Sequence, residues 1–266
     1  MFWSLVLDPC KDMPYLTVAG ERVHHVEWRP TPGTAAPVIL IHGAGGTHQH
    51  WLYQVRDLPA SPTIALDLPG HGRSEGKGRD SIAAYGDWIV DFLDAAGIEQ
   101  AVLVGHSMGG GIALDVALRH PSRVAGLGLV ATGARLRVAP ALLDGIRQNT
   151  DAAVALISRW AFGPEAPEEM VRLARLQMGQ TPGEVFYGDF VACDTFDVTE
   201  RLAEIRVPAI VLCGTGDKMT PAKYALYLQD HIEDADLHLI EGAGHMVMVE
   251  RPQDVTEALA AFVEGL

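Results

Sequence analysis

The chain has 266 residues, of which 48% are apolar and 20% charged, as in folded globular proteins. This length allows one large domain, or one core that carries an insertion. The formal net charge of -14 argues against nucleic acid and anionic membrane surfaces as partners, because binding to them requires clustered Lys and Arg. No apolar run reaches the roughly 18 residues of a membrane span. Residues 1–7 are apolar but short and lack a basic flank, so we do not interpret them as a signal peptide.

The three cysteines, Cys10, Cys193 and Cys213, are widely spaced and odd in number. They form neither a zinc-type pattern nor a disulfide framework, which suits a reducing compartment, so we expect a cytoplasmic protein. Cys213 ends an apolar run that starts at Ala209, which predicts a core residue and not a reactive thiol. No motif in the sequence indicates a cofactor, and we expect none.

Short β-rich runs alternate with helical patterns along the chain. Residues 15–18 and 23–28 predict an antiparallel hairpin, turned at Ala19-Gly20. Buried strands are predicted at residues 38–41, 63–66, 101–104, 124–130, 209–212 and 237–240. Helices are predicted at about residues 82–96, 109–119, 221–229 and 252–262. This alternation predicts an α/β fold with a mostly parallel, doubly wound sheet that is covered by helices on both faces.

Residues 132–201 break this alternation. They contain no convincing strand, but apolar residues recur at helical spacing in several pieces, separated by Gly163-Pro164 and Thr181-Pro182-Gly183. We therefore predict a helical cap at 132–201, inserted into a core formed by 1–131 and 202–266. Residues 132–182 hold six arginines, no lysine and five acidic residues, so this stretch differs in charge from the acidic remainder.

Gly105-His106-Ser107-Met108-Gly109 is a G-x-S-x-G motif between a predicted strand and a predicted helix. That context is what a nucleophilic serine on a sharp turn requires, with glycines leaving room for the close backbones. The alternative is a chance match in a chain with 28 glycines. The strand-turn-helix context favours Ser107 as the nucleophile.

A serine nucleophile needs a base within hydrogen-bond reach, and the chain offers eleven histidines. His245 follows the last predicted strand, and Asp217 follows the strand before it. Ligand sites in open α/β sheets form beyond the carboxyl ends of the strands, so Ser107, Asp217 and His245 are expected to meet there. Their order along the chain is the one expected for this motif, with Asp217 orienting His245 as the general base. The alternative is that Asp217 is a turn residue in a glycine-rich loop and that His245 is an ordinary loop residue, since either residue alone is weak evidence.

The remaining histidines are weaker candidates for the base. His42, His71 and His106 belong to other motifs, and His48 and His50 lie on a loop or a first helical turn. A metal site at His48 and His50 is conceivable, but we expect no acidic or cysteine ligand to complete it.

An oxyanion requires two preorganised backbone donors. The N–H of Met108, directly after the nucleophile, is one candidate. The glycine-rich loop 42–46 supplies the other, for which we select the N–H of Ala44; this loop also fits a simple turn. Residues 67–74, Asp-Leu-Pro-Gly-His-Gly-Arg-Ser, are interpreted as a structural turn at the base of the site.

Taken together, these motifs resemble the α/β-hydrolase superfamily, and specifically its cap-bearing bacterial members. The segments that carry the resemblance are residues 41–43, 67–74, 105–110, 214–217, 244–245 and 250–252. The resemblance implies a hydrolase that acts on a small molecule through an acyl-enzyme, in a group that includes carboxylesterases, lactonases, thioesterases, carbon–carbon bond hydrolases and cofactor-free haloperoxidases.

The residues around Ser107 narrow this range. Haloalkane dehalogenases and epoxide hydrolases carry Asp at the nucleophile position, and carbon–carbon hydrolases often carry Asn where this chain has His106. We therefore expect a small, largely apolar carboxylic ester, or a related lactone or thioester, as substrate. The alternatives are a carbon–carbon bond hydrolase acting on a vinylogous diketone, and a non-catalytic small-molecule receptor on the same fold.

Two sets of side chains in the predicted cap bear on the substrate. Most of the large apolar residues are expected to pack the cap and some to face the cleft: Leu142, Leu143, Ile146, Trp160, Phe162, Met170, Phe186 and Phe190. Solvated helix faces are the default interpretation of the six arginines: Arg135, Arg137, Arg147, Arg159, Arg172 and Arg175. The sharper hypothesis is that one arginine reaches the cleft and binds a carboxylate on the substrate.

Overall fold

The computed structural model describes residues 15–28, 36–58 and 61–266, and residues 1–7 and Cys10 lie outside this part of the chain. The described strands form one eight-stranded sheet in the order β1-β2-β4-β3-β5-β6-β7-β8. β1 and β2 pair antiparallel, as does β2 with β4, and the other pairs are parallel. The predicted α/β fold with a mostly parallel sheet is confirmed.

Each predicted strand is present. The strands are β1 (Tyr15–Val18), β2 (Glu21–Trp28), β3 (Val38–Ile41), β4 (Thr63–Leu66), β5 (Ala101–His106), β6 (Val124–Val130), β7 (Ala209–Gly214) and β8 (Ala235–Ile240). β5 and β7 extend beyond the predicted ends because His106 pairs with Val130 and Gly214 pairs with Ile240. Pairing with a neighbouring strand thus outweighs the weak strand preference of glycine at these ends.

Alternating residues of the central strands enter two separate apolar cores. In β3, Ile39 and Ile41 pack in one core, whereas Val38 and Leu40 pack in the other. The same alternation holds along β5. A strand that is buried on both faces forms a continuous apolar run in the sequence, which is why these strands are recognisable from the sequence.

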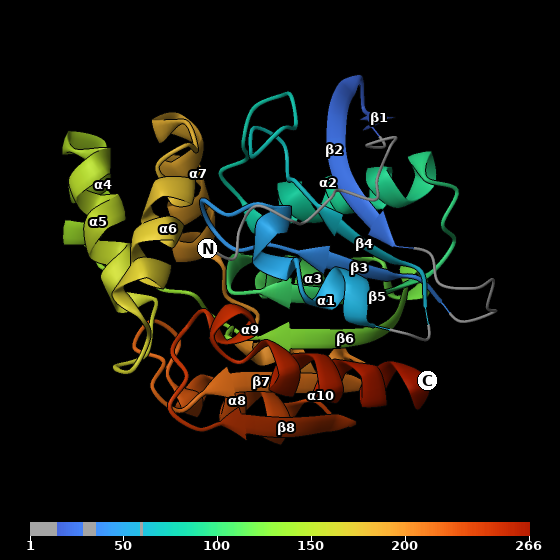
Figure 1. Ribbon diagram of the computed structural model, residues 1–266. Helices are drawn as coiled ribbons and strands as arrows, with labels where there is room; N and C mark the ends of the chain where they lie inside the picture. Colours follow the sequence, from blue (N-terminus) through green and yellow to red (C-terminus); the bar gives the residue numbers. More distant parts are fainter. Residues whose placement is uncertain (1–14, 29–35, 59–60) are drawn as a thin grey trace.

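Helices cover both faces of the sheet. α1 (Gln54–Asp57), α9 (Val247–Glu250) and α10 (Pro252–Glu264) lie in front of it in Figure 1. On the opposite face are α2 (Ile82–Ala95), α3 (Met108–Arg119) and α8 (Ala222–His231). Short 3-10 helices lie at His48–Trp51, Pro121–Arg123 and Thr199–Glu204. No helix in the described ranges is both long and apolar enough to span a bilayer.

Between β6 and β7 the chain forms a group of four helices, all within residues that the structure describes. They are α4 (Pro140–Gln148), α5 (Thr150–Trp160), α6 (Glu168–Met178) and α7 (Gly183–Thr195). Figure 1 shows them beside the sheet, at the end toward which the parallel strands point. An isolated β-bridge between Arg135 and Asp197 joins the two ends of this segment. The helical content agrees with the sequence, while the division into core and cap at residues 132 and 201 stays a prediction.

Candidate active site

Ser107 lies on the turn between β5 and α3. Its backbone has φ 53° and ψ −115°, a positive φ that is uncommon and strained for a residue other than glycine. The turn is held by the Ser107 N–H, which donates to Val130 O at 2.9 Å, and by the Thr132 hydroxyl, which donates to Ser107 O at 2.7 Å. Ser107 on this turn lines a cavity.

The glycines of the motif permit this turn because no side chain would fit at their positions. A Cβ at Gly105 would lie 2.1 Å from the carbonyl oxygen of Gly109, and a Cβ at Gly109 would lie 2.4 Å from Ile41 O. Gly43 plays the same part on the neighbouring loop, where a Cβ would come within 3.2 Å of Ser107 Cβ. The loop after β3 is thereby held directly against the serine.

Asp217 and His245 are joined by a buried hydrogen bond of 2.8 Å between Asp217 Oδ2 and His245 Nδ1. Asp217 Oδ2 also accepts from the Thr220 hydroxyl at 2.7 Å, and its Oδ1 accepts from the N–H groups of Met219 and Thr220 at 2.8 and 2.9 Å. Burial by itself raises the pKa of Asp217, but His245 and these donors outweigh it and hold the pKa below its ordinary value. Asp217 is therefore a charged, fixed acceptor.

Ser107 and His245 line the same cavity, but the described structure contains no hydrogen bond between the serine hydroxyl and this histidine. Nucleophile–base hydrogen bonds often become short and aligned only when substrate binds. His106 contacts His245 directly: its ring lies 4.7 Å from that of His245, and its Nε2 donates to His245 O at 3.0 Å. Burial lowers the pKa of His106 well below the ordinary value, so its ring is neutral.

The two proposed oxyanion donors flank Ser107. Met108 is the first residue of α3, and Ala44 is the second residue of a turn closed by Gly46 N–H donating to Gly43 O at 3.0 Å. Within the described residues, neither the Ala44 nor the Met108 N–H donates a hydrogen bond to another protein group. Both donors are thus free for an oxyanion.

The cavity has a volume of about 290 Å³, and its walls are mostly apolar. Of the described lining residues, eleven come from the segment between β6 and β7: Leu136, Arg137, Val138, Ala139, Leu142, Ile157, Trp160, Ala161, Met178, Phe190 and Cys193. Of the large apolar residues singled out from the sequence, Leu142, Trp160 and Phe190 face the cavity, and the others pack in the apolar cores. The expectation that most of them pack and some face the cleft is met.

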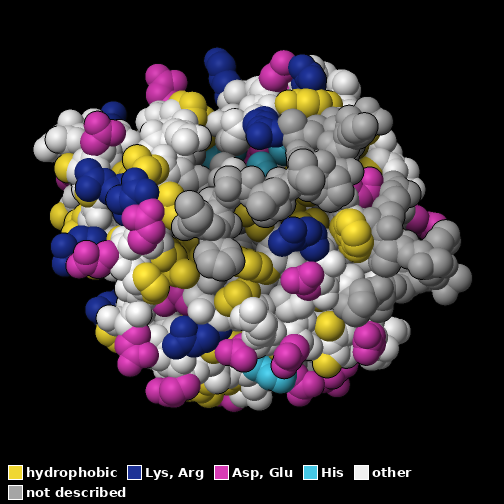
Figure 2. Space-filling view, viewed as in Figure 1, with side chains coloured by type: hydrophobic (Ala, Val, Ile, Leu, Met, Phe, Trp, Pro, Cys, Tyr) yellow, Lys and Arg dark blue, Asp and Glu magenta, His cyan; other side chains and the backbone are white. Residues whose placement is uncertain are grey.

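All six arginines of this segment are solvent-exposed, as the default interpretation predicts. Figure 2 shows apolar, basic and acidic side chains intermixed over these helices, at the left of the view. Arg137 alone among the six also lines the cavity, together with Lys218, which no sequence motif singled out. No acidic residue belongs to the described lining. Although the net charge of the chain is -14, the described lining of this cavity thus contains two cationic side chains and no acidic one.

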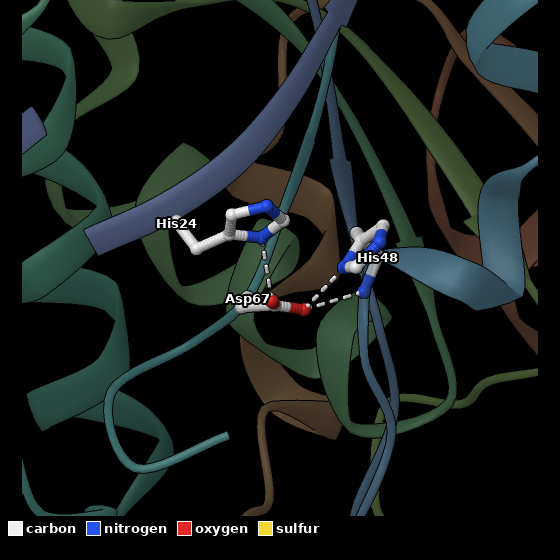
Figure 3. Close-up of side chains that lie close together, drawn as sticks. All are labelled: His24, His48 and Asp67. Atoms are coloured by element: carbon white, nitrogen blue, oxygen red, sulfur yellow. Dashed lines mark hydrogen bonds and ion pairs between the residues drawn. The ribbon is translucent and has the colours of Figure 1, made fainter. Parts of the chain in front are cut away.

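A second group of buried polar residues lies behind the loop after β3. His24 Nδ1 and His48 Nδ1 each lie 2.8 Å from a carboxylate oxygen of Asp67. Figure 3 shows the two rings directed at the carboxylate from different elements. The sequence pairs His48 only with His50 as possible metal ligands, whereas the structure groups His48 with His24 and Asp67, and Asp67 is an acidic neighbour that the sequence did not indicate. The backbone N–H groups of His48 and Arg73 also donate to this carboxylate. Four donors fill its acceptor positions, so we interpret the cluster as a structural hub of the 67–74 turn.

Two further acidic residues near the site were not identified from the sequence. Asp189 of α7 is fully buried beside the loop after β3, and Glu250 accepts from the N–H groups of Gly163 and Gly244, both at 2.9 Å. The sequence did contain an indication of Asp189. This residue shares one helix face with Phe186 and Phe190, and an acidic side chain on an apolar face requires buried partners.

Comparisons with known proteins agree with this architecture. Residues 38–258 match the model of the alpha/beta hydrolase family. A pimeloyl-[acyl-carrier protein] methyl ester esterase from Neisseria meningitidis is 30% identical over 261 residues, covering 90% of this chain and 98% of that protein. The solved structure of a thermophilic esterase is 34% identical with a TM-score of 0.83, covering 95% of this chain and 97% of that one. The enol-lactonase from Burkholderia xenovorans is 25% identical with a TM-score of 0.88, covering 94% and 100%. The chain belongs to the alpha/beta hydrolase family and is a hydrolase.

Proposed function

We propose that the protein is a serine hydrolase that cleaves a small, largely apolar carboxylic ester, or a related lactone or thioester. The observation that carries the proposal is the strained Ser107 turn, which opens into an apolar cavity beside a histidine bound to a buried aspartate. Relatives named as a methyl ester esterase and an enol-lactonase support the ester and lactone classes.

In this mechanism, His245 Nε2 takes the proton of Ser107 while Oγ attacks the carbonyl carbon of the substrate. Asp217 accepts from Nδ1–H, which fixes the tautomer of His245 and stabilises its imidazolium form. The imidazolium then gives its proton to the leaving oxygen as the carbon–oxygen bond breaks, which leaves the acyl group on Ser107. A water molecule deprotonated by His245 attacks this acyl group, releases the carboxylic acid and restores the serine hydroxyl.

The tetrahedral intermediates carry a negative charge on the former carbonyl oxygen. We assign the N–H groups of Ala44 and Met108 to this oxygen, because both lie beside Ser107 and neither is used by another described group. The N-terminus of α3 adds a favourable partial positive charge at the same place.

Residues 132–201 serve as a cap in this proposal, because they supply much of the apolar cavity wall. The volume of about 290 Å³ lies at the low end of ligand pockets, which favours a small substrate. We also propose a role for Arg137 and Lys218, the two cationic residues of the cavity lining, which we call the rim. They favour substrates whose far end carries a carboxylate, since no acidic residue in the described lining competes for them.

The reaction class is tested with a short-chain nitrophenyl ester under multiple turnover. We expect sustained release of nitrophenol by the wild type and its loss in Ser107→Ala and in His245→Ala. A protein that binds the ester without turnover would instead be a receptor. If the protein hydrolyses no ester but cleaves a vinylogous diketone, it is a carbon–carbon bond hydrolase and the proposal is wrong.

The rim is tested with two esters of equal length, one neutral and one with a terminal carboxylate. Arg137→Ala and Lys218→Ala should lower kcat/KM for the acidic ester and leave the neutral ester within about twofold. Arg147→Ala is the matched control, since Arg147 lies over the ring of Tyr187 and does not line the cavity. An unchanged ratio of the two kcat/KM values in both rim variants would refute the carboxylate preference.

A further inference from the structure

Gly45, next to the proposed oxyanion donor Ala44, is held on three sides by the α6–α7 region. Its N–H donates to Asp189 Oδ2 at 2.8 Å, and its carbonyl oxygen accepts from the Thr181 hydroxyl at 3.1 Å. The ring of Phe186 fills the third side, where a Cβ at position 45 would approach it to 2.5 Å. Both polar groups of one loop residue are thus bound by side chains more than a hundred residues away.

Asp189 is fully buried and has two more partners. The hydroxyl of Tyr85 donates to its Oδ1 at 2.6 Å, and His71 Nε2 lies 2.8 Å from its Oδ2. The other ring nitrogen of His71 lies 3.0 Å from Pro69 O, which can only accept, so both nitrogens of His71 carry protons. Burial by itself lowers the pKa of His71, but the Asp189 carboxylate outweighs it and raises the pKa above its ordinary value.

This charged pair places a fixed acceptor beside the turn 43–46. An oxyanion donor works when its nitrogen lies within about 2.7–3.1 Å of the developing charge, and displacements of about 0.5 Å already weaken a site. Gly45 has φ +63°, a conformation without the usual restraint of a side chain, so the turn needs restraint from outside. Asp189 and Thr181 supply it through the two polar groups of Gly45.

We propose that Asp189 and Thr181 are positioning residues that hold Gly45 so that the Ala44 N–H points at the oxyanion. The inference rests on the proposed function, because it presupposes an oxyanion formed at Ser107. It also gives the inserted helices a second role, since they line the cavity and in addition set the geometry of a catalytic donor in the core.

The competing explanation is that the network only attaches the cap to the core. A variant of Tyr85 distinguishes the two explanations, because the Tyr85 hydroxyl donates to Asp189 Oδ1, whereas Gly45 donates to Oδ2. Tyr85→Phe therefore removes one buried hydrogen bond from Asp189 without touching the loop. Asp189→Asn is the conservative rescue, since its amide oxygen at the Oδ2 position still accepts from Gly45 while its NH₂ group faces the Tyr85 hydroxyl.

The experiment measures kcat and KM for a short-chain nitrophenyl ester in wild type, Asp189→Ala, Asp189→Asn, Thr181→Val and Tyr85→Phe. It also measures inhibition by a trifluoromethyl ketone, which forms a tetrahedral oxyanion with the serine, and by the matching methyl ketone. We expect kcat to fall about 10- to 100-fold in Asp189→Ala with KM within about threefold, below the roughly 10²–10³-fold cost of deleting an oxyanion donor. Thr181→Val should lose about 3- to 10-fold, and the other two variants should stay within about threefold.

Inhibition by the trifluoromethyl ketone should weaken by the factor that kcat/KM loses, while inhibition by the methyl ketone stays constant. Equal kcat values for Asp189→Ala and Tyr85→Phe would overturn the inference. If Asp189→Ala does not fold, Thr181→Val decides: a selective loss of kcat supports the inference and an unchanged kcat overturns it. Full activity of Ser107→Ala would instead refute the proposed function itself, and this result can be distinguished from a failure of the inference about Asp189 and Thr181.

Discussion

The hydrogen bonds of Asp217 predict how a single-atom change should stop the reaction. In Asp217→Asn one carboxylate oxygen becomes an NH₂ group, and the surroundings decide which one. Oδ1 accepts from the backbone N–H groups of Met219 and Thr220, so the amide oxygen must stay on that side. The NH₂ group then faces His245 Nδ1, which must become an acceptor, so the proton moves to Nε2. A histidine with Nε2 protonated cannot take the proton of Ser107.

The size of the effect follows from the cost of turning the amide around. The reversed orientation leaves two buried or half-buried N–H groups without an acceptor, at about 1–3 kcal/mol each, or roughly 2–6 kcal/mol together. About 1.4 kcal/mol corresponds to a factor of ten, so the productive orientation falls to between about 4 × 10⁻² and 5 × 10⁻⁵ of the molecules. Loss of the carboxylate charge beside the imidazolium adds to this, and we expect kcat to fall about 10³- to 10⁴-fold.

The assay is steady-state hydrolysis of a nitrophenyl ester, with circular dichroism to verify the fold. Thr220→Val is the matched control, because it removes the hydroxyl 3.1 Å from His245 Nδ1 but keeps the carboxylate. It should cost at most about tenfold. A kcat for Asp217→Asn within tenfold of the wild type would refute the assignment of Asp217 as the group that orients the base.

Three further predictions concern stability, each measured by urea unfolding. Gly105→Ala should lower the free energy of unfolding by about 3 kcal/mol or more, because its Cβ would lie 2.1 Å from a backbone carbonyl oxygen. Gly145→Ala, whose Cβ would have nothing within 4 Å, is the control and should be neutral or stabilising. Equal stabilities of the two variants would contradict this prediction. Glu250→Gln should cost about 1–3 kcal/mol, since one of two N–H groups loses its acceptor, and no loss would show that the carboxylate is dispensable. The raised pKa of His71 means that its pairing with Asp189 contributes stability fully below about pH 6.5 and loses it as the pH rises through the folded-state pKa. Asp189→Asn should therefore lower the free energy of unfolding more at pH 6 than at pH 9, and the reverse order would contradict the charged pair. Besides Asp189, His42 and Asp67 are titratable groups that face His71.

The sheet and the loops at its carboxyl edge could be predicted because their signals are local. A strand buried on both faces, such as Val38–Ile41, is a short apolar run, and the residues that follow such strands meet at one edge of the sheet. That rule sufficed to expect Asp217 beside His245, which the structure places 2.8 Å apart. The strand-turn-helix context likewise sufficed to expect a sharp turn at Ser107.

The polar contacts that brace these loops could not be predicted in the same way. Asp189 meets Gly45 across 144 residues of sequence, and His24 meets Asp67 across 43. Such pairs depend on how separate elements pack, which neither periodicity nor turn chemistry encodes. Buried acids of this kind show in sequence only as a polar residue on an otherwise apolar face, as for Asp189 between Phe186 and Phe190. The place of Arg137 at the cavity rim could not be predicted either, because it depends on how the inserted segment leaves β6.

The central claim, covalent catalysis by Ser107, is tested most directly by trapping the acyl-enzyme. The wild type is mixed with excess short-chain nitrophenyl ester, quenched in acid within the first turnovers and analysed by intact mass and peptide mapping. We predict a mass increase of one acyl group, located on the peptide that contains Ser107 and absent from Ser107→Ala. Sustained hydrolysis by Ser107→Ala, or an acyl group on another residue in the wild type, would contradict the mechanism.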